Sequence, residues 1–234
     1  FQMEITNTSF INNSCPYADS NGHAIFASTL NGPIVMNNCT FADNGNDIIE
    51  EHSAIYTGSQ LFIYNTSLSF TEKKDDRKCR AIFVGESSDF ILDNSIISNF
   101  TINNAVGGSL YYTLSNTKLQ HIINIINSVF VNNSGSKCVE LYLNVYEDPV
   151  IKNCTFINQY ISSDLIILDY SNPAIAARNT IIFDQIHCID SSFNGNKVLT
   201  IKNSNEQLTM NEIILDHCQL INNKDLVFAS LKDP

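Results

Sequence analysis

The chain has 234 residues, with 13 Lys and Arg against 24 Asp and Glu, so its formal charge is −11 at pH 7. This acidic balance argues against a nucleic-acid backbone or an anionic membrane surface as a partner. No apolar run reaches the ~20 residues that a membrane-spanning helix needs, and no N-terminal signal-peptide pattern is visible. Both ends fall beside strand-like segments, so we expect the chain to be a piece of a longer protein.

A short motif recurs along the whole chain at intervals of 26 to 37 residues. We call it the Asn motif: Asn, a small residue, a variable residue and Phe, followed by an Asn-rich exit. Its clearest copy lies within Val150–Asn158. The eight copies are Asn7–Phe10, Asn38–Phe41, Asn65–Leu68, Asn94–Ile97, Asn127–Phe130, Asn153–Phe156, Asp190–Phe193 and His217–Leu220. Self-similarity at such a period is the signature of a repeat architecture.

Two further apolar segments alternate with the Asn motif in each repeat. The first is exemplified by Gly22–Phe26 and His52–Tyr56, and the second by Pro33–Met36. Their β-branched and aromatic residues, separated by Gly, Asn, Ser and Pro, favour strands over helices. Three short strands per repeat predict an all-β fold, a right-handed single-stranded parallel β-helix (solenoid). We expect about eight coils of roughly 30 residues, forming a single domain over residues 1–234.

The alternation of side chains along these strands predicts which residues face outward. Glu140 falls in one column with four aromatic residues, and an unpaired buried Glu is costly, so this column should point outward. The aromatic members of the column are Phe26, Tyr56, Phe83 and Tyr111. On adjacent coils they would form a continuous aromatic stripe, and an exposed apolar patch of this kind usually marks a binding surface.

The Asn motif has a different expected arrangement. Its Phe residues should point into the core, and a bend at Asn153 is needed to keep Ile151 inside and Lys152 outside. The column of Asn residues then marks a corner of the solenoid. Stacked Asn side chains at this corner can satisfy one another and the turning backbone.

The motifs resemble those of a known repeat family. Gly107–Leu110, His52–Ile55 and Cys79–Ile82 are loose copies of Gly-Gly-Ala-Ile. Copies of Phe-x-x-Asn occur at Phe10–Asn13, Phe41–Asn44, Phe130–Asn133 and Phe193–Asn196. This alternation resembles the repeats of polymorphic outer-membrane proteins (Pmp) over nearly the whole chain. The resemblance implies a surface-exposed or secreted β-helix of the pectin-lyase-like type, commonly an adhesin passenger. The Asn- and Ile-rich composition is similar to that of such repeats in surface proteins of protozoan parasites.

The pectin-lyase-like superfold also contains enzymes that cleave polysaccharides, and these need two or three carboxylates on one face. Here the Asp residues are scattered, so we expect no catalytic residue, no cofactor and no metal site. A polysaccharide lyase or glycoside hydrolase with its carboxylates on loops remains the alternative. A calcium site formed by Glu50, Glu51, Asp75 and Asp76 is conceivable, but the Lys and Arg residues beside them favour surface ion pairs.

N-glycosylation sequons and cysteines can indicate whether a protein passes through the secretory pathway. Seven Asn-x-Ser/Thr sequons permit N-glycosylation in a eukaryotic secretory pathway. They lie at Asn7, Asn12, Asn38, Asn65, Asn99, Asn132 and Asn153. The seven cysteines are an odd number, and Cys39, Cys154 and Cys218 share one expected column but lie too many coils apart for a disulfide. We expect mostly free thiols that fill the core.

Together these features predict a non-enzymatic segment of a surface or extracellular protein. It would act as a rigid stalk or adhesin, with the aromatic stripe binding carbohydrate or protein. The expected partner is a host-cell or matrix protein or glycan, or a neighbouring subunit of an assembly. The expected location is the cell surface or the secreted fraction. A structural element of a filament or larger assembly is a further possibility.

Overall fold

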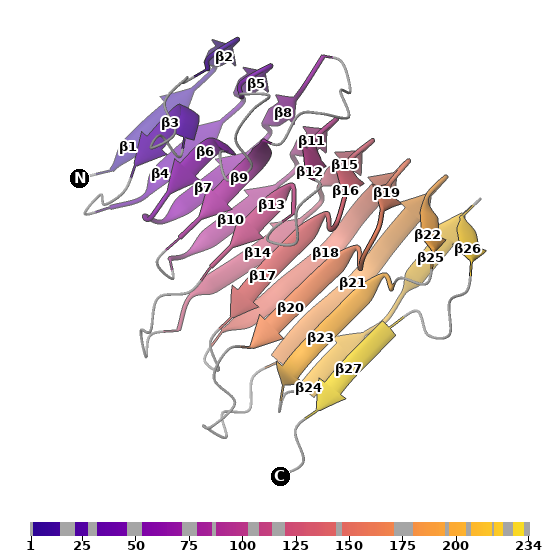
Figure 1. Ribbon diagram of the computed structural model, residues 1–234. Helices are drawn as coiled ribbons and strands as arrows, with labels where there is room; N and C mark the ends of the chain where they lie inside the picture. Colours follow the sequence, from indigo (N-terminus) through magenta and orange to yellow (C-terminus); the bar gives the residue numbers. More distant parts are fainter. Residues whose placement is uncertain are drawn as a thin grey trace.

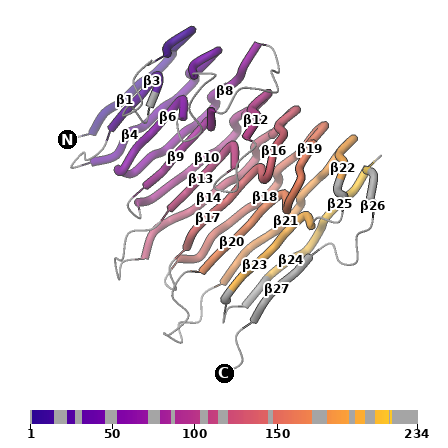
Figure 2. Tube along the Cα trace, in the orientation of Figure 1, coloured from indigo at the N-terminus to yellow at the C-terminus, as the bar shows by residue number. Residues whose placement is uncertain are grey.

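The computed structural model describes residues 2–14, 22–27, 32–45, 53–71, 79–85, 88–102, 108–113, 120–143, 147–170, 180–194, 197–204, 207–216, 218–221 and 227–231. Within these ranges the chain is all-β, and its strands pair in parallel with the strands of the coils before and after them. The fold is a parallel β-solenoid, in which successive coils lie side by side from the indigo to the yellow end (Figures 1 and 2). Across the described residues, no helix has the length and hydropathy needed to cross a bilayer.

A complete coil follows three sheets in turn. The first sheet, which we call the stripe wall, contains β3 (Gly22–Ala27), β6 (Ser53–Thr57), β9 (Arg80–Val84), β13 (Leu110–Tyr112), β17 (Val139–Leu143), β20 (Ile166–Tyr170), β23 (Leu199–Ser204) and β27 (Val227–Leu231). The third sheet, the short wall, contains β12 (Thr101–Ile102), β16 (Ser134–Gly135), β19 (Tyr160–Ile161), β22 (Ser192–Asn194) and β26 (Gln219–Ile221).

The second sheet, between these two, bends into two panels. The first panel contains β1 (Met3–Thr6), β4 (Ile34–Asn37), β7 (Leu61–Tyr64), β10 (Phe90–Asp93), β14 (Ile122–Ile126) and β24 (Gln207–Met210). The second panel contains β2 (Ser9–Ile11), β5 (Thr40–Ala42), β8 (Ser67–Ser69), β11 (Ile96–Ser98), β15 (Val129–Val131) and β25 (Ile213–Asp216). Two strands, β18 (Asp148–Ile157) and β21 (Thr180–Ile189), run through both panels.

In the described part of the chain, the number of complete coils is smaller than the sequence suggests. Among the described residues the stripe wall has eight strands, but the short wall has five. About five turns therefore have all three walls, against the eight expected from the motif count. The short wall is missed because its strands are only two or three residues long, too short to show an alternating pattern. The right-handed sense of winding stays a prediction.

Inward-facing side chains form one continuous core along the solenoid. On the stripe wall, strand pairing places the following residues in one buried column, as expected: Ile25, Ile55, Ile82, Leu110 and Val139. On the second panel Phe41, Phe130 and Phe156 are fully buried, and the rings of Phe130 and Phe156 stack with centroids 4.7 Å apart. The predicted facing of these two columns is confirmed.

The Asn corner joins the two panels, and its backbone is left-handed. Its six Asn residues have φ between 48° and 53°: Asn7, Asn38, Asn65, Asn94, Asn127 and Asn153. Asn tolerates this conformation better than most residues because its short polar side chain bonds locally. Asn38 Nδ2 donates to Asn7 Oδ1 over 2.6 Å, and Asn153 Nδ2 donates to Asn127 Oδ1 over 2.8 Å. The predicted Asn corner is confirmed, including the bend at Asn153.

A second corner, the exit corner, joins the second panel to the short wall and explains the Phe-x-x-Asn motif. The third motif residue turns the chain, as Asn132 does with φ 53°. The fourth, Asn133, is buried and bridges to the preceding coil. Its Nδ2 donates to the Ile97 carbonyl and its Oδ1 accepts the Phe100 N–H, both over 3.1 Å. The motif therefore combines an inward Phe, a left-handed turn and a buried amide that ties two coils together.

Strand pairing corrects the assignment of the last two Asn motifs. Phe156 pairs with Cys188, whereas Phe193 pairs with Ile161 of the short wall. Asp190–Phe193 therefore begins at the exit corner and not at the Asn corner. The Asn corner of this coil is made by Gln185, with φ 52°, which the sequence pattern does not reveal.

The same correction applies to Cys218. Because Gln219 pairs with Ser192, Cys218 is aligned with Ser191 at the exit corner. The prediction that Cys218 shares the column of Cys39 and Cys154 is therefore wrong. His217, the first residue of the eighth motif copy, lies outside the described residues.

We expect Asn133→Ala to lower the free energy of unfolding by about 1–3 kcal/mol, because the substitution leaves the buried Ile97 carbonyl and Phe100 N–H without their partner. Urea unfolding followed by circular dichroism measures the change. Asn124→Ala is the control, since Asn124 faces outward on the first panel and is only half-buried; its effect should stay within about 0.5 kcal/mol. Equal losses in the two variants would contradict a bridging role for Asn133.

Candidate functional site

The aromatic stripe lies on the outer face of the stripe wall. Strand pairing aligns Phe26 with Tyr56, Tyr56 with Phe83, and Phe83 with Tyr111. The ring centroids of these successive pairs are 5.3, 4.6 and 5.3 Å apart. Tyr142 extends the contact, with its ring edge-on to Tyr111 at 5.8 Å. The four predicted residues are therefore brought together, and their rings touch from coil to coil.

The rings of the stripe cover one another's faces. The Tyr56 ring is nearly parallel to both neighbours, at 22° to Phe26 and 9° to Phe83, so it is sandwiched between them. Phe83 and Tyr111 are tilted by 57°. The Arg80 guanidinium lies over both of these rings, 6.0 Å from the Phe83 centroid and 5.2 Å from that of Tyr111. Such cation–π contacts stabilise a ring pair from one side.

Exposure falls steeply along the stripe. Phe26 is 55% exposed, Tyr56 and Phe83 are half-buried, and Tyr111 is 9% exposed. Glu140, the next residue of the column, is only 1% exposed. The expectation that the whole column is open to solvent is therefore wrong beyond Phe83. Glu140 escapes the cost of isolated burial because Lys137 Nζ lies 2.5 Å from its Oε1.

Charged and hydroxyl groups border the buried end of the stripe. Burial, reinforced by the nearby Glu140 carboxylate, raises the pKa of Tyr142 to about 12. On the following coils Thr200 Oγ1 donates to Asp164 Oδ2 over 2.6 Å, and Lys202 lies 3.6 Å from Asp169. Along the outer face of the stripe wall, exposed aromatic rings thus give way to buried and hydrogen-bonded polar residues.

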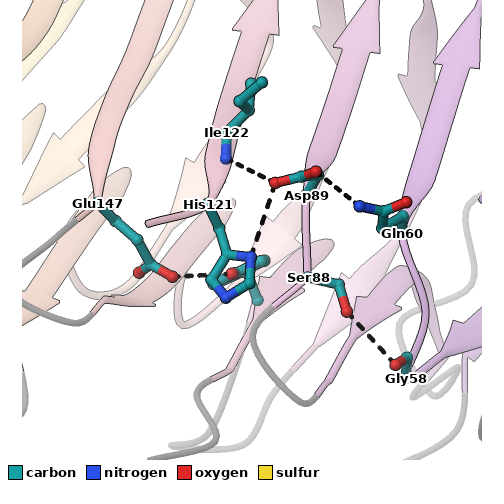
Figure 3. A network of polar contacts seen from close by, with 8 residues as sticks. Gly58, Gln60, Ser88, Asp89, His121, Ile122 and Glu147 are labelled. Carbon is teal, nitrogen blue, oxygen red and sulfur yellow. Dashed lines mark hydrogen bonds and ion pairs between the residues drawn. The ribbon is translucent and has the colours of Figure 1, made fainter. Parts of the chain in front are cut away.

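A second polar cluster, absent from the sequence-based expectations, lies at the corner between the stripe wall and the first panel (Figure 3). Asp89 is its centre: Oδ2 accepts Gln60 Nε2 over 2.7 Å, and Oδ1 accepts the Ile122 N–H over 2.9 Å. His121 Nδ1 lies 3.6 Å from the same Oδ1. Gln60, Asp89 and His121 each stand directly before a first-panel strand, and this recurring polar position was the available sequence signal.

The same pair of hydrogen bonds recurs two coils further on, around Asp148. Asp148 Oδ1 accepts the Thr180 N–H over 2.6 Å, and its Oδ2 accepts Gln120 Nε2 over 3.0 Å. Each Asp therefore satisfies a backbone N–H of the next coil and a Gln side chain. This recurrence indicates that the corner carboxylates hold coils together.

A buried pair completes the cluster. Tyr112 points into the core, and its hydroxyl donates to Glu147 Oε1 over 3.1 Å. Burial first, and then the Glu147 carboxylate, raise the pKa of Tyr112 above its ordinary value. Both side chains are fully buried, so the pair is part of the packed interior.

The described residues contain no group of three or more His, Cys, Asp or Glu side chains arranged to hold a metal ion. Glu50, Glu51, Asp75 and Asp76, the conceivable calcium ligands, lie outside the described ranges.

The seven sequons all lie at corners, with left-handed φ between 50° and 64° at each Asn. Asn7, Asn38, Asn65 and Asn153 are at the Asn corner, and Asn12, Asn99 and Asn132 at the exit corner. Five are exposed, whereas Asn99 and Asn132 are half-buried. Glycosylation at these positions stays a prediction.

Six of the seven cysteines lie in the described part of the chain, where none forms a disulfide. Five are buried, and Cys218 is partly exposed. Burial raises the pKa of Cys154 and of Cys188 to about 12, and it also raises that of Cys138. For these six residues the prediction of core thiols is confirmed; Cys15 lies outside the described ranges.

Comparison with known proteins finds no matching family model, no matching curated protein and no matching solved structure. The class to which the chain can be assigned is that of its fold, a parallel β-solenoid.

We expect the protein to lose stability as pH rises from about 9 towards 12. Unfolded thiols ionise with a pKa near 8.5, whereas the buried Cys154 and Cys188 stay protonated until about pH 12. The native state then binds more protons than the unfolded state, so the free energy of unfolding falls with pH. Urea midpoints measured between pH 7 and 11 test this. A Cys154→Ala/Cys188→Ala variant should show a shallower fall, and an identical slope in both proteins would contradict the assignment.

Proposed function

We propose that this chain is a non-enzymatic, rigid segment of a surface or extracellular protein that holds a partner against its aromatic stripe. The observation that carries the proposal is the exposed end of the stripe, where Phe26, Tyr56 and Phe83 line up on consecutive coils. Monomeric proteins rarely expose contiguous apolar side chains without a binding role.

Rigidity is supported by the way the coils are joined. Each coil is bonded to the next by strand ladders and by side-chain amides at the Asn and exit corners, as with Asn38 and Asn133. A solenoid joined in this way is a quasi-one-dimensional rod. Such a rod suits a spacer or stalk that presents a binding surface away from its anchor.

Location at the cell surface or in the secreted fraction is supported by the motifs that resemble Pmp repeats, whose proteins are surface-exposed. Copies such as Phe41–Asn44 and Phe130–Asn133 carry this resemblance. Seven corner sequons are compatible with a eukaryotic secretory route.

Antibodies raised against residues 1–234 test the location. On intact cells of the source organism they should label the surface or capture the protein from the medium. An antibody to a cytosolic protein, which should stain only permeabilised cells, serves as the control. Labelling that appears only after permeabilisation would contradict the proposal.

A further inference from the structure

All seven N-glycosylation sequons border the same surface, the outer face of the second panel. Four stand at the Asn corner, where the chain enters this panel, and three at the exit corner, where it leaves. The strands that they flank lie side by side on consecutive coils (Figure 1): β2, β5, β8, β11, β15 and β18. Each of these strands has at least one sequon beside it, and every sequon lies away from the two corners that border the stripe wall.

The panel between the two rows of sequons is uncharged. Its outward side chains on these strands are Ser, Thr, Ala, Val and Ile, and none of them is buried. They are Ser9, Ile11, Thr40, Ala42, Ser67, Ser69, Ile96, Ser98, Val129, Val131, Thr155 and Ile157. The first panel, in contrast, carries Glu4, Asp93 and Lys152 on its outer face in the same coils. On the second panel, charge appears only beyond the last sequon, at Asp216 of β25.

The corner amides have a donor to spare for a glycan. A side-chain amide has two N–H groups. Asn38, Asn65 and Asn153 each donate to the preceding coil, over 2.6, 2.9 and 2.8 Å. Glycosylation breaks one Nδ2–H bond and forms a bond from Nδ2 to C1 of the first sugar. The lipid pyrophosphate that carried the oligosaccharide leaves with the electron pair of its bond to C1, and the amide proton is released. One N–H stays on Nδ2 for the bond to the preceding coil.

The second panel is narrow enough for glycans at its edges to cover it. Its strands β2, β5, β8, β11 and β15 are three residues long, which gives a width of about 10 Å at ~3.3 Å per residue. An oligosaccharide of several sugars spans this width, and the apolar faces of its rings remove Ile and Val side chains from water. Because coils are only ~4.8 Å apart, we expect incomplete occupancy where sequons of one corner follow on successive coils.

We propose that N-linked oligosaccharides attached at the two corners cover the outer face of the second panel and leave the stripe wall bare. This inference rests on the proposed function, because N-glycosylation requires entry into a secretory pathway. It names the occupant of the second panel, which is anchored covalently along both edges of that panel. The aromatic stripe then lies on a wall that no sequon borders, where a partner can approach it.

The test uses residues 1–234 secreted from a mammalian cell line whose glycans are held in the high-mannose form. Endoglycosidase H removes each glycan but leaves its first sugar on Nδ2, so no Asn becomes Asp. Peptide mass spectrometry then identifies the occupied sequons, and carbene labelling before and after the enzyme measures coverage. We expect occupied sequons at both corners. Labelling of Ile96, Val129 and Ile157 should rise several-fold when the glycans are removed, whereas that of Tyr56 and Phe83 should not change.

Thr155→Val tests the covering at one coil. It removes the sequon of Asn153 but keeps the Asn153 side chain and its bond to Asn127. Without enzyme treatment, labelling of Ile157 should rise in this variant, whereas labelling of Ile96, two coils away, should stay low. Thr209→Val is the matched control, because Thr209 lies on β24 of the first panel and belongs to no sequon. It should be labelled like the unaltered protein, and circular dichroism should show that both variants keep the fold.

The outcomes separate this inference from the proposed function. Empty sequons in the secreted chain, or occupied sequons whose removal leaves the labelling of the second panel unchanged, would overturn the inference but not the role of the stripe. An equal rise in the labelling of Tyr56 and Phe83 would overturn the bare stripe wall. The location on which the proposed function depends is tested by its own readout, the antibody labelling of intact and permeabilised cells.

Discussion

The fold depends on hydrogen bonds that side chains at the corners make to the neighbouring coil. At the Asn corner, the Asn38 amide donates to Asn7 of the preceding coil. At the exit corner, the buried Asn133 amide bonds the backbone of the preceding coil. At the corner between the stripe wall and the first panel, Asp89 and Asp148 each accept a backbone N–H of the following coil. Strand ladders alone specify register weakly wherever both faces of a strand are similar. The corner hydrogen bonds therefore help to fix the register of successive coils, which aligns equivalent side chains in columns.

That alignment is the origin of the candidate functional site. Phe26, Tyr56 and Phe83 are each 27 to 30 residues apart in sequence, yet their rings touch because every coil returns to the same place. A slip of one residue in a single coil would turn its aromatic side chain to the opposite face. The proposed rigidity and the proposed binding surface therefore depend on one constraint, the register of the coils.

Much of this arrangement could be predicted from the sequence because its causes are local. Alternation along a strand identifies Ile55 as inward and Tyr56 as outward, and the left-handed preference of Asn identifies Asn38 as a corner. Other features depend on residues far apart. Gln185 takes an Asn position only because its strand pairs with β18. The strands of the short wall are too short to show a period, and the expected eight coils were counted from the Asn motif alone.

The character of the stripe was also beyond sequence reasoning. An outward direction does not determine exposure, since Glu140 and Tyr111 lie on the outer face of the stripe wall and are nevertheless buried. The angles between the rings of the stripe also depend on contacts between distant residues, such as that of Arg80 with Tyr111. The hydrogen bonds of Asp89 were not predicted, because Gln60 and Asp89 precede the strands and belong to no apolar motif.

The most direct test of coil stacking is a nuclear Overhauser measurement on protein labelled at Phe and Tyr rings. The account predicts cross-peaks from the Tyr56 ring to the rings of both Phe26 and Phe83, since the centroids lie 5.3 and 4.6 Å away. Cross-peaks to only one of the two, or strong contacts typical of antiparallel hairpins between neighbouring strands, would contradict the parallel stack on which the proposed binding surface depends.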